Sequence, residues 1–163
     1  MNQDQQLISW LNDGYMMEKS LEEVLLKHIN DFQELSEWCE RLLQHVDETR
    51  LHAARIRKCI ELLGGSPSLT KTLAGELIGR VEGLSTAIFP DELIKNGLAE
   101  YTAEHMEIAC YTALIAAAEE ATQPHVAEVC REILTQEQAM AAWLLEQIPN
   151  LTRHHLTAQM AAA

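Results

Sequence analysis

The stretch FQELSEWCERLLQHVDETRLHAARIRKCIELL, residues 32–63, has the clearest repeat in the chain. One set of its side chains recurs at alternating steps of three and four residues, which is the spacing of one face of an α-helix. That set is Leu35, Trp38, Leu42, His45, Thr49, His52, Ile56, Cys59 and Leu63. The stretch is therefore predicted to be a long helix that buries two imidazoles among apolar side chains.

Glu48 adds a carboxylate to this face. It lies three residues after His45 and four before His52, so the three side chains are expected on one side of the helix. A carboxylate in a dry core costs several kcal/mol unless it is protonated, paired or bound to a cation. The face is therefore a candidate site.

A preceding helix is predicted over residues 6–30, and it carries Glu18 on its apolar stripe. The pattern breaks at Asn30-Asp31. Asp31 followed three residues later by Glu34 is typical of a capping box at the start of the next helix. These two helices form one hairpin.

A helix in the second half of the chain is predicted over residues 89–122, with Glu104 and Glu107 on its inner face. Gly97 is expected to bend or divide it. The final helix is predicted over residues 124–148 and carries Glu137.

Pro149 is expected to end the final helix and to leave residues 149–163 as a frayed tail. A shorter helix, over residues 69–85, lies in the long crossover between the two hairpins. Short turns make each pair of helices antiparallel. We therefore predict one all-α domain over residues 1–163, a ferritin-like antiparallel four-helix bundle with its main part at residues 6–148.

In each hairpin, the acids of the two helices lie at similar distances from the turn that joins them. Glu18 lies about 13 residues before the first turn, and His45 and Glu48 lie about 14 to 17 after it, which is roughly 20 Å along the helices. Glu107 and Glu137 lie about 16 residues before and about 14 after the second turn. The carboxylates are therefore expected to meet if the hairpins pack side by side.

Carboxylates from four helices together with imidazole are the donors of di-metal centres in helical bundles. Oxygen and nitrogen donors favour iron or manganese, one or two ions per chain. The predicted metal ligands are Glu18, His45, Glu48, His52, Glu104, Glu107 and Glu137. Two other interpretations stay open, because the acids can pair with Arg50, Arg55 or Arg57 and the two histidines can be core imidazoles bonded to glutamates. The remaining histidines near turns and in the tail are expected to be solvated: His28, His125, His154 and His155.

The charge of the chain disfavours two classes of partner. The formal net charge of −13 disfavours nucleic acid and anionic membranes, which both need a basic face. The start of the chain lacks the features of a signal peptide, and no apolar run reaches the roughly 20 residues of a membrane span.

The four cysteines are widely spaced and are expected to be reduced, so we predict a cytoplasmic protein.

Several short motifs resemble those of the bacterial YciE/YciF family, with a closer likeness to the YciE branch. They are Trp10-Leu-Asn-Asp13, Met17-Glu18-Lys19, His45-x-x-Glu48-Thr49, Ile88-Phe89-Pro90, Glu104-x-x-Glu107-Ile-Ala-Cys-Tyr-Thr112, and Glu137 with Met140 and Trp143-Leu144. The resemblance implies a ferritin-like, stress-associated homodimer related to rubrerythrin and manganese catalase. It also implies bound iron or manganese and a peroxide- or O2-dependent oxidoreductase activity.

The chain departs from the general di-iron pattern, which has Glu-x-x-His on two helices. The second helix has His45-x-x-Glu48 in the reverse order, and the last helix has Met140 where a histidine would follow Glu137. An alternative function is therefore a non-catalytic dimeric helical-bundle stress protein with a degenerate metal site.

Overall fold

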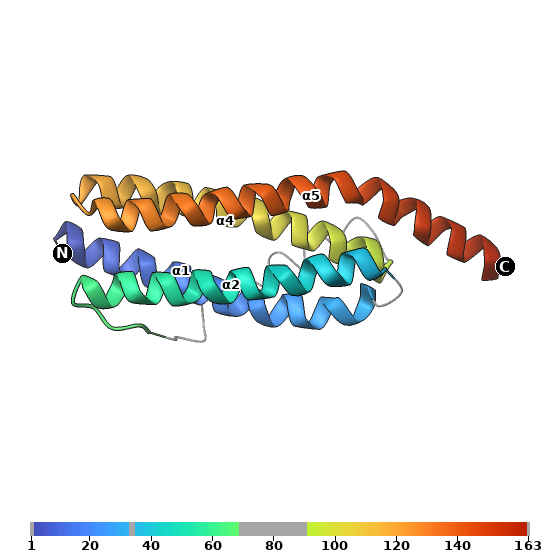
Figure 1. Cartoon of the computed structure of the whole chain (residues 1–163), viewed down its shortest axis with the longest axis horizontal. Helices are drawn as coiled ribbons and strands as arrows, with labels where there is room; N and C mark the ends of the chain where they lie inside the picture. The colour runs from blue at the N-terminus through green and yellow to red at the C-terminus, as the bar shows by residue number, and fades with distance from the viewer. Residues whose placement is uncertain (1, 33–34, 69–90, 163) are drawn as a thin grey trace.

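The computed structural model describes residues 2–32, 35–68 and 91–162, and within these ranges the chain forms four α-helices and no strand. The helices are α1 (Gln3–His28), α2 (Ser36–Leu62), α4 (Glu92–Glu120) and α5 (Pro124–Ala162), and a 3-10 helix, η1 (Ile29–Phe32), follows α1. Figure 1 shows two antiparallel hairpins, α1–α2 and α4–α5, lying side by side. The predicted all-α four-helix bundle is confirmed.

Local sequence signals explain where the helices begin and end. The Asn2 side chain accepts a hydrogen bond from the Gln5 amide at 2.8 Å, and the Gln5 side chain accepts one from the Asn2 amide at 3.1 Å, which forms a capping box at α1. After α2, Gly64 takes a positive φ of 77°, a conformation that costs a glycine little. The predicted breaks near residue 30 and at the glycines after α2 are therefore correct.

The buried apolar residues form two clusters, one in each half of the bundle. One cluster includes Leu7, Ile56 and Ile133, and the other includes Trp38 and Leu144. His52 of α2 and Glu137 of α5 fall between the segments that these two clusters use. These two predicted ligands therefore lie where the two clusters meet along the bundle.

Gly97 does not divide its helix, because α4 is continuous from Glu92 to Glu120. Its role is close packing. A Cβ atom at this position would lie 2.6 Å from Leu151 Cδ2 and 3.4 Å from Trp38 Cη2. The glycine therefore lets α4 approach the first turn of α2 and the part of α5 around Leu151.

Pro149 does not end the last helix, so the predicted helix end and frayed tail are wrong. Helix α5 continues through Pro149 to Ala162. Proline cannot bond the carbonyl of Leu145, but Leu145 is 54% exposed, so water has access to that side of the helix. Leu151, just beyond the proline, is 2% exposed, and its burial favours continuation of the helix.

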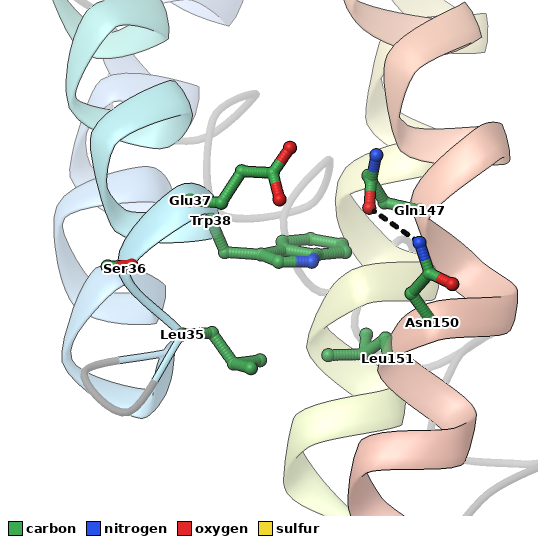
Figure 2. Close-up of a pocket in the computed structure, with 7 residues that line it drawn as sticks. All are labelled: Leu35, Ser36, Glu37, Trp38, Gln147, Asn150 and Leu151. Carbon is green, nitrogen blue, oxygen red and sulfur yellow. Dashed lines mark hydrogen bonds between the residues drawn. The ribbon is translucent and has the colours of Figure 1, made fainter.

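Two predictions fall wholly or partly on residues that the structure does not describe. They are the capping box at Asp31 and Glu34 and the crossover helix over residues 69–85. In the described ranges, no helix combines the length and apolar character needed to cross a membrane. A cavity of about 260 Å³ lies between the first turn of α2 and α5 (Figure 2), lined by Leu35, Ser36, Glu37, Trp38, Gln147, Asn150 and Leu151.

Candidate metal centre

Six of the seven predicted ligands meet in the interior of the bundle. One group is His45, Glu104, Glu107 and Glu137, and a second is Glu18, His52 and Glu137. In each group the possible ligand atoms lie within 4.8 Å of one another. Glu137 belongs to both groups, so the two sets of donors share a carboxylate.

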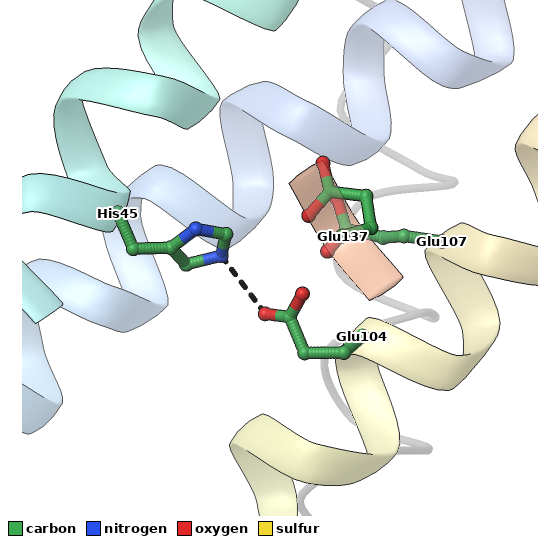
Figure 3. Close-up of side chains that lie close together, drawn as sticks. All are labelled: His45, Glu104, Glu107 and Glu137. Carbon is green, nitrogen blue, oxygen red and sulfur yellow. Dashed lines mark ion pairs between the residues drawn. The ribbon is translucent and has the colours of Figure 1, made fainter. Parts of the chain in front are cut away.

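The first group joins three helices. Figure 3 shows His45 of α2 pointing toward Glu104 and Glu107 of α4 and Glu137 of α5. His45 Nε2 lies 2.8 Å from Glu104 Oε1, and both side chains are at most 2% exposed. This ring nitrogen therefore lies among three carboxylates that solvent does not reach.

The second group adds α1. His52 Nδ1 lies 2.8 Å from Glu137 Oε1 and 3.6 Å from Glu18 Oε2. The Tyr111 hydroxyl donates a hydrogen bond to the other oxygen of Glu18, Oε1. One oxygen of Glu18 is thus held by the protein, while the other faces the shared site.

Five buried atoms in these two groups have no hydrogen-bond partner within the described part of the chain. They are Glu18 Oε2, His52 Nδ1, Glu104 Oε2, Glu137 Oε1 and Glu137 Oε2. His52 Nδ1 and Glu137 Oε1 are close at 2.8 Å, but their approach lacks the direction of a hydrogen bond. An unsatisfied buried polar atom is costly, and a cation would satisfy a convergent set of five such acceptors and donors. The donor set therefore fits a metal ion.

Both histidines are oriented by a partner on their outer side. Glu48 Oε2 accepts a hydrogen bond from His45 Nδ1 at 3.2 Å, and Gln136 Oε1 accepts one from His52 Nε2 at 2.6 Å. Because these oxygens only accept, the inner nitrogen of each ring is left free for an ion. This arrangement is typical of histidine ligands in metal sites.

Glu48 is not one of the converging donors, so the structure does not bring this predicted ligand together with the other six. Its side chain is 19% exposed and also accepts hydrogen bonds from Arg41 Nη1 at 3.1 Å and Gln44 Nε2 at 2.8 Å. At about 100° per residue, Glu48 lies roughly 60° around α2 from His45, which turns it toward the surface. Glu48 therefore supports a ligand from outside the centre.

Burial and charge shift the pKa values of the cluster. Burial raises the pKa of Glu18 and of Glu107, and it raises that of Glu104 to about 8 even though the nearby His45 acts to lower it. Burial acts to lower the pKa of His52, but its contacts with Glu137 and Glu18 prevail and raise it to about 10. Without a metal, the cluster therefore holds protons that its residues would release in water.

We expect the metal-free protein to lose stability between about pH 5 and about pH 8. The pKa of Glu104 is about 8 in the folded chain against an ordinary value of 4.5, so the folded state binds more protons in this interval. The free energy of unfolding should therefore fall as pH rises, by at most about 1.4 kcal/mol per pH unit for each such group. His52 acts in the same direction at higher pH, because its contribution is lost as pH rises through about 10.

Bound metal should reverse this pH dependence, because its ligands must be deprotonated. Urea unfolding with chelator, and again with saturating Mn(II), measures both slopes. A metal-free protein whose stability rises across the same interval would contradict the assignment of protons to the cluster.

Sequence reasoning missed a second buried acid–imidazole pair. His28 of α1 and Glu100 of α4 are each 2% exposed, and His28 Nδ1 contacts Glu100 Oε1. His28 was expected to be solvated, and that prediction is wrong. The available signal was Glu100 itself, which lies four residues before Glu104 and seven before Glu107, on the same face of α4.

Of the other three histidines that were expected to be solvated, one is exposed and two are half-buried. His125 is exposed, as predicted. His154 and His155 are half-buried because α5 continues past Pro149, and His155 Nε2 lies 3.3 Å from Asp91 Oδ1. The expectation of a solvated tail is therefore wrong for these two residues.

Comparisons with known proteins support the fold. A protein of Xanthomonas campestris pv. campestris is 33% identical, with 98% of this chain and 99% of that one covered and a TM-score of 0.83. The Escherichia coli stress protein YciF is 22% identical, with 94% and 98% covered and a TM-score of 0.79. A bacterioferritin of Desulfovibrio desulfuricans, which has a di-iron site, is 18% identical, with 97% and 90% covered and a TM-score of 0.76.

The last two similarities show that the fold is a ferritin-like four-helix bundle. Residues 2–157 match a protein family described as a domain of unknown function (DUF892), which is nearly the whole chain. The chain therefore belongs to the DUF892 family.

Proposed function

We propose that this protein is a ferritin-like, stress-associated metalloprotein that holds two iron or manganese ions in the core of its bundle. The observation that carries the proposal is the set of five unpartnered buried donor atoms in two groups that share Glu137. Cations satisfy such a set without adding more buried charge of the same sign.

The composition of the donor set supports a di-metal centre. Ferritin-like di-metal proteins use a Glu from each of two helices and Glu-x-x-His from each of the other two, which makes four carboxylates and two imidazoles. The two groups here also contain four carboxylates and two imidazoles. The departures of the sequence from the motif therefore do not leave the set of donors incomplete.

The donors are distributed differently among the helices. Thr49 lies three residues before His52, where the motif has glutamate, and Met140 lies three residues after Glu137, where it has histidine. Helix α4 supplies two carboxylates, those of Glu104 and Glu107, and α2 supplies a second imidazole, that of His45. We infer that the additional carboxylate and His45 take the places of the glutamate and the histidine that the motif lacks here.

In such a site the protein positions donors, holds protons and excludes water. Glu48 and Gln136 hold the two imidazoles, and Tyr111 donates a hydrogen bond to Glu18. Iron or manganese, when bound, supplies the one-electron redox chemistry that O2 or peroxide requires. We therefore propose a peroxide- or O2-dependent oxidoreductase activity for the loaded protein.

Metal content tests the proposal. After anaerobic dialysis against Fe(II) or Mn(II) and removal of free ion, elemental analysis should find about two ions per chain. Glu132→Gln is the matched control, because this residue lies on α5 five positions before Glu137 and its side chain is 57% exposed. It should retain the ions, and wild-type protein that retains neither metal would overturn the proposal.

The alternative, a non-catalytic bundle, rests on a different observation. His45 pairs with Glu104, and His52 lies beside Glu137, so imidazolium ions offset part of the buried negative charge without metal. That function predicts a stable protein with no metal uptake, which the same dialysis detects.

We propose a cytoplasmic homodimer of the YciE branch, as the sequence resemblance implies. Sedimentation velocity that finds only a single-chain mass would contradict the dimer.

A further inference from the structure

The centre is closed to solvent, so an ion needs a route to reach it. The six converging ligands are each 2% exposed or less. The described contacts of Glu18 lead to Tyr111, which is fully buried, and to His52. The described contacts of Glu18 therefore end in the core.

The outer partners of the two histidines do reach the surface. Glu48, which contacts His45, is 19% exposed, and Gln136, which contacts His52, is an exposed residue of α5. Both contacts start from α2, but only Glu48 offers a negative charge. It is therefore the carboxylate through which the surface and the buried ligands are connected.

Helical spacing places Glu48 on a polar stripe of α2 that faces α5. The stripe follows steps of three and four residues and consists of Arg41, Gln44, Glu48, His52 and Arg55. Two of its members contact α5, since His52 bonds Gln136 and Arg55 pairs with Glu132. The seam between α2 and α5 is thus lined by polar side chains at the level of the centre.

The cavity in Figure 2 also lies between α2 and α5. Glu37 lies four residues before Arg41 on the stripe, and it faces Gln147 of α5 across the cavity. Packing between these two helices is therefore incomplete next to the stripe.

We propose that divalent cations enter along this seam, and that Glu48 is the first carboxylate to bind them. Arg41 donates to the same carboxylate oxygen that His45 Nδ1 contacts, so its guanidinium competes with an incoming ion for Glu48. His45 would then connect Glu48 with the first group, since its Nδ1 contacts Glu48 and its Nε2 lies 2.8 Å from Glu104 Oε1. This inference rests on the proposed function, because it supplies the route to that centre.

The two members of the Arg41–Glu48 pair should have opposite effects on loading. Glu48→Gln removes the charge that attracts the ion but keeps an acceptor for His45 Nδ1, so loading should slow by about tenfold. The affinity for the ion falls as well, because an outer partner of a ligand is altered, so the final amount of metal is compared at saturating Co(II), where it should match the wild type. Arg41→Gln removes the competing cation and should accelerate loading by several fold. The measurement is stopped-flow absorption after mixing metal-free protein with Co(II), with the final stoichiometry read at equilibrium.

The chain contains a matched control pair. Arg50 of α2 donates to Glu22 of α1 at 2.7 Å, on the opposite edge of α2 from the stripe. Glu22→Gln and Arg50→Gln change the net charge by the same amounts, so any general effect of charge on cation approach appears in them as well. Both should load at the wild-type rate.

The outcomes separate the route from the centre. Wild-type protein that takes up no Co(II) would overturn the proposed function and the route with it. Full uptake with an unchanged rate in Glu48→Gln, or equal changes in the control pair, would overturn the route alone. Opposite shifts at Glu48 and Arg41 with unchanged stoichiometry would support it.

Discussion

Replacing Glu137 with glutamine is expected to abolish binding of both metal ions. Glu137 is the one residue that belongs to both groups of donors, and it is fully buried. Glutamine has nearly the same size but carries no charge and offers a single acceptor oxygen. Loss of a residue that hydrogen-bonds a ligand already lowers metal affinity by about 10- to 100-fold. Loss of a ligand shared by both groups should lower it by more than that.

Glu18→Gln is the matched variant for this test. Glu18 is equally buried, but it belongs to the second group alone. It should therefore reduce the metal content to about one ion per chain, while Glu137→Gln reduces it to about zero, as measured by elemental analysis after dialysis. Equal losses in the two variants would show that the groups do not share Glu137 as a ligand.

Replacing His28 with alanine is expected to destabilise the protein by about 3–5 kcal/mol. His28 Nδ1 contacts Glu100 Oε1, and the two side chains are each 3% exposed, about one helical turn along α4 from Glu104. Removal of the imidazole leaves the Glu100 carboxylate buried without this partner, which is the costly way to break a buried pair. Urea unfolding of metal-free protein near pH 7 measures the loss.

Two further variants separate the unpaired charge from lost packing. The double variant His28→Leu/Glu100→Leu removes both polar groups and should recover most of the stability, because apolar replacements of a buried pair are often close to neutral. His125→Ala changes an exposed histidine and should alter the free energy of unfolding by less than about 0.5 kcal/mol. A His28→Ala loss as small as that of His125→Ala would contradict the account of this pair.

Much of the fold follows from periodicity in the sequence. The repeat of three and four residues around His45 predicts α2, and the glycines after it predict its end, because both depend on local backbone and burial preferences. The continuation of α5 past Pro149 depends instead on Leu151, which is buried near Gly97 and Trp38. A contact between distant segments is not visible in a local pattern, so the proline alone gave the wrong helix end.

The candidate site also has parts that follow from the sequence and parts that do not. Equal distances from the two turns predict that Glu18, Glu107 and Glu137 meet, because helix rise per residue is fixed. The orientation of Glu48 is not fixed by depth, since a side chain on the edge of a helical stripe can face either the core or the surface. The partners Tyr111 and Gln136 were missed for a related reason, because each hydrogen bond joins residues far apart in the sequence.

The most direct test of the metal centre is anomalous diffraction from crystals of the protein loaded with Mn(II). The account predicts two peaks inside the bundle, one beside His45, Glu104 and Glu107 and one beside Glu18 and His52, with Glu137 next to both. A map of loaded crystals with no peak among these residues, or with manganese bound to surface carboxylates alone, would contradict it.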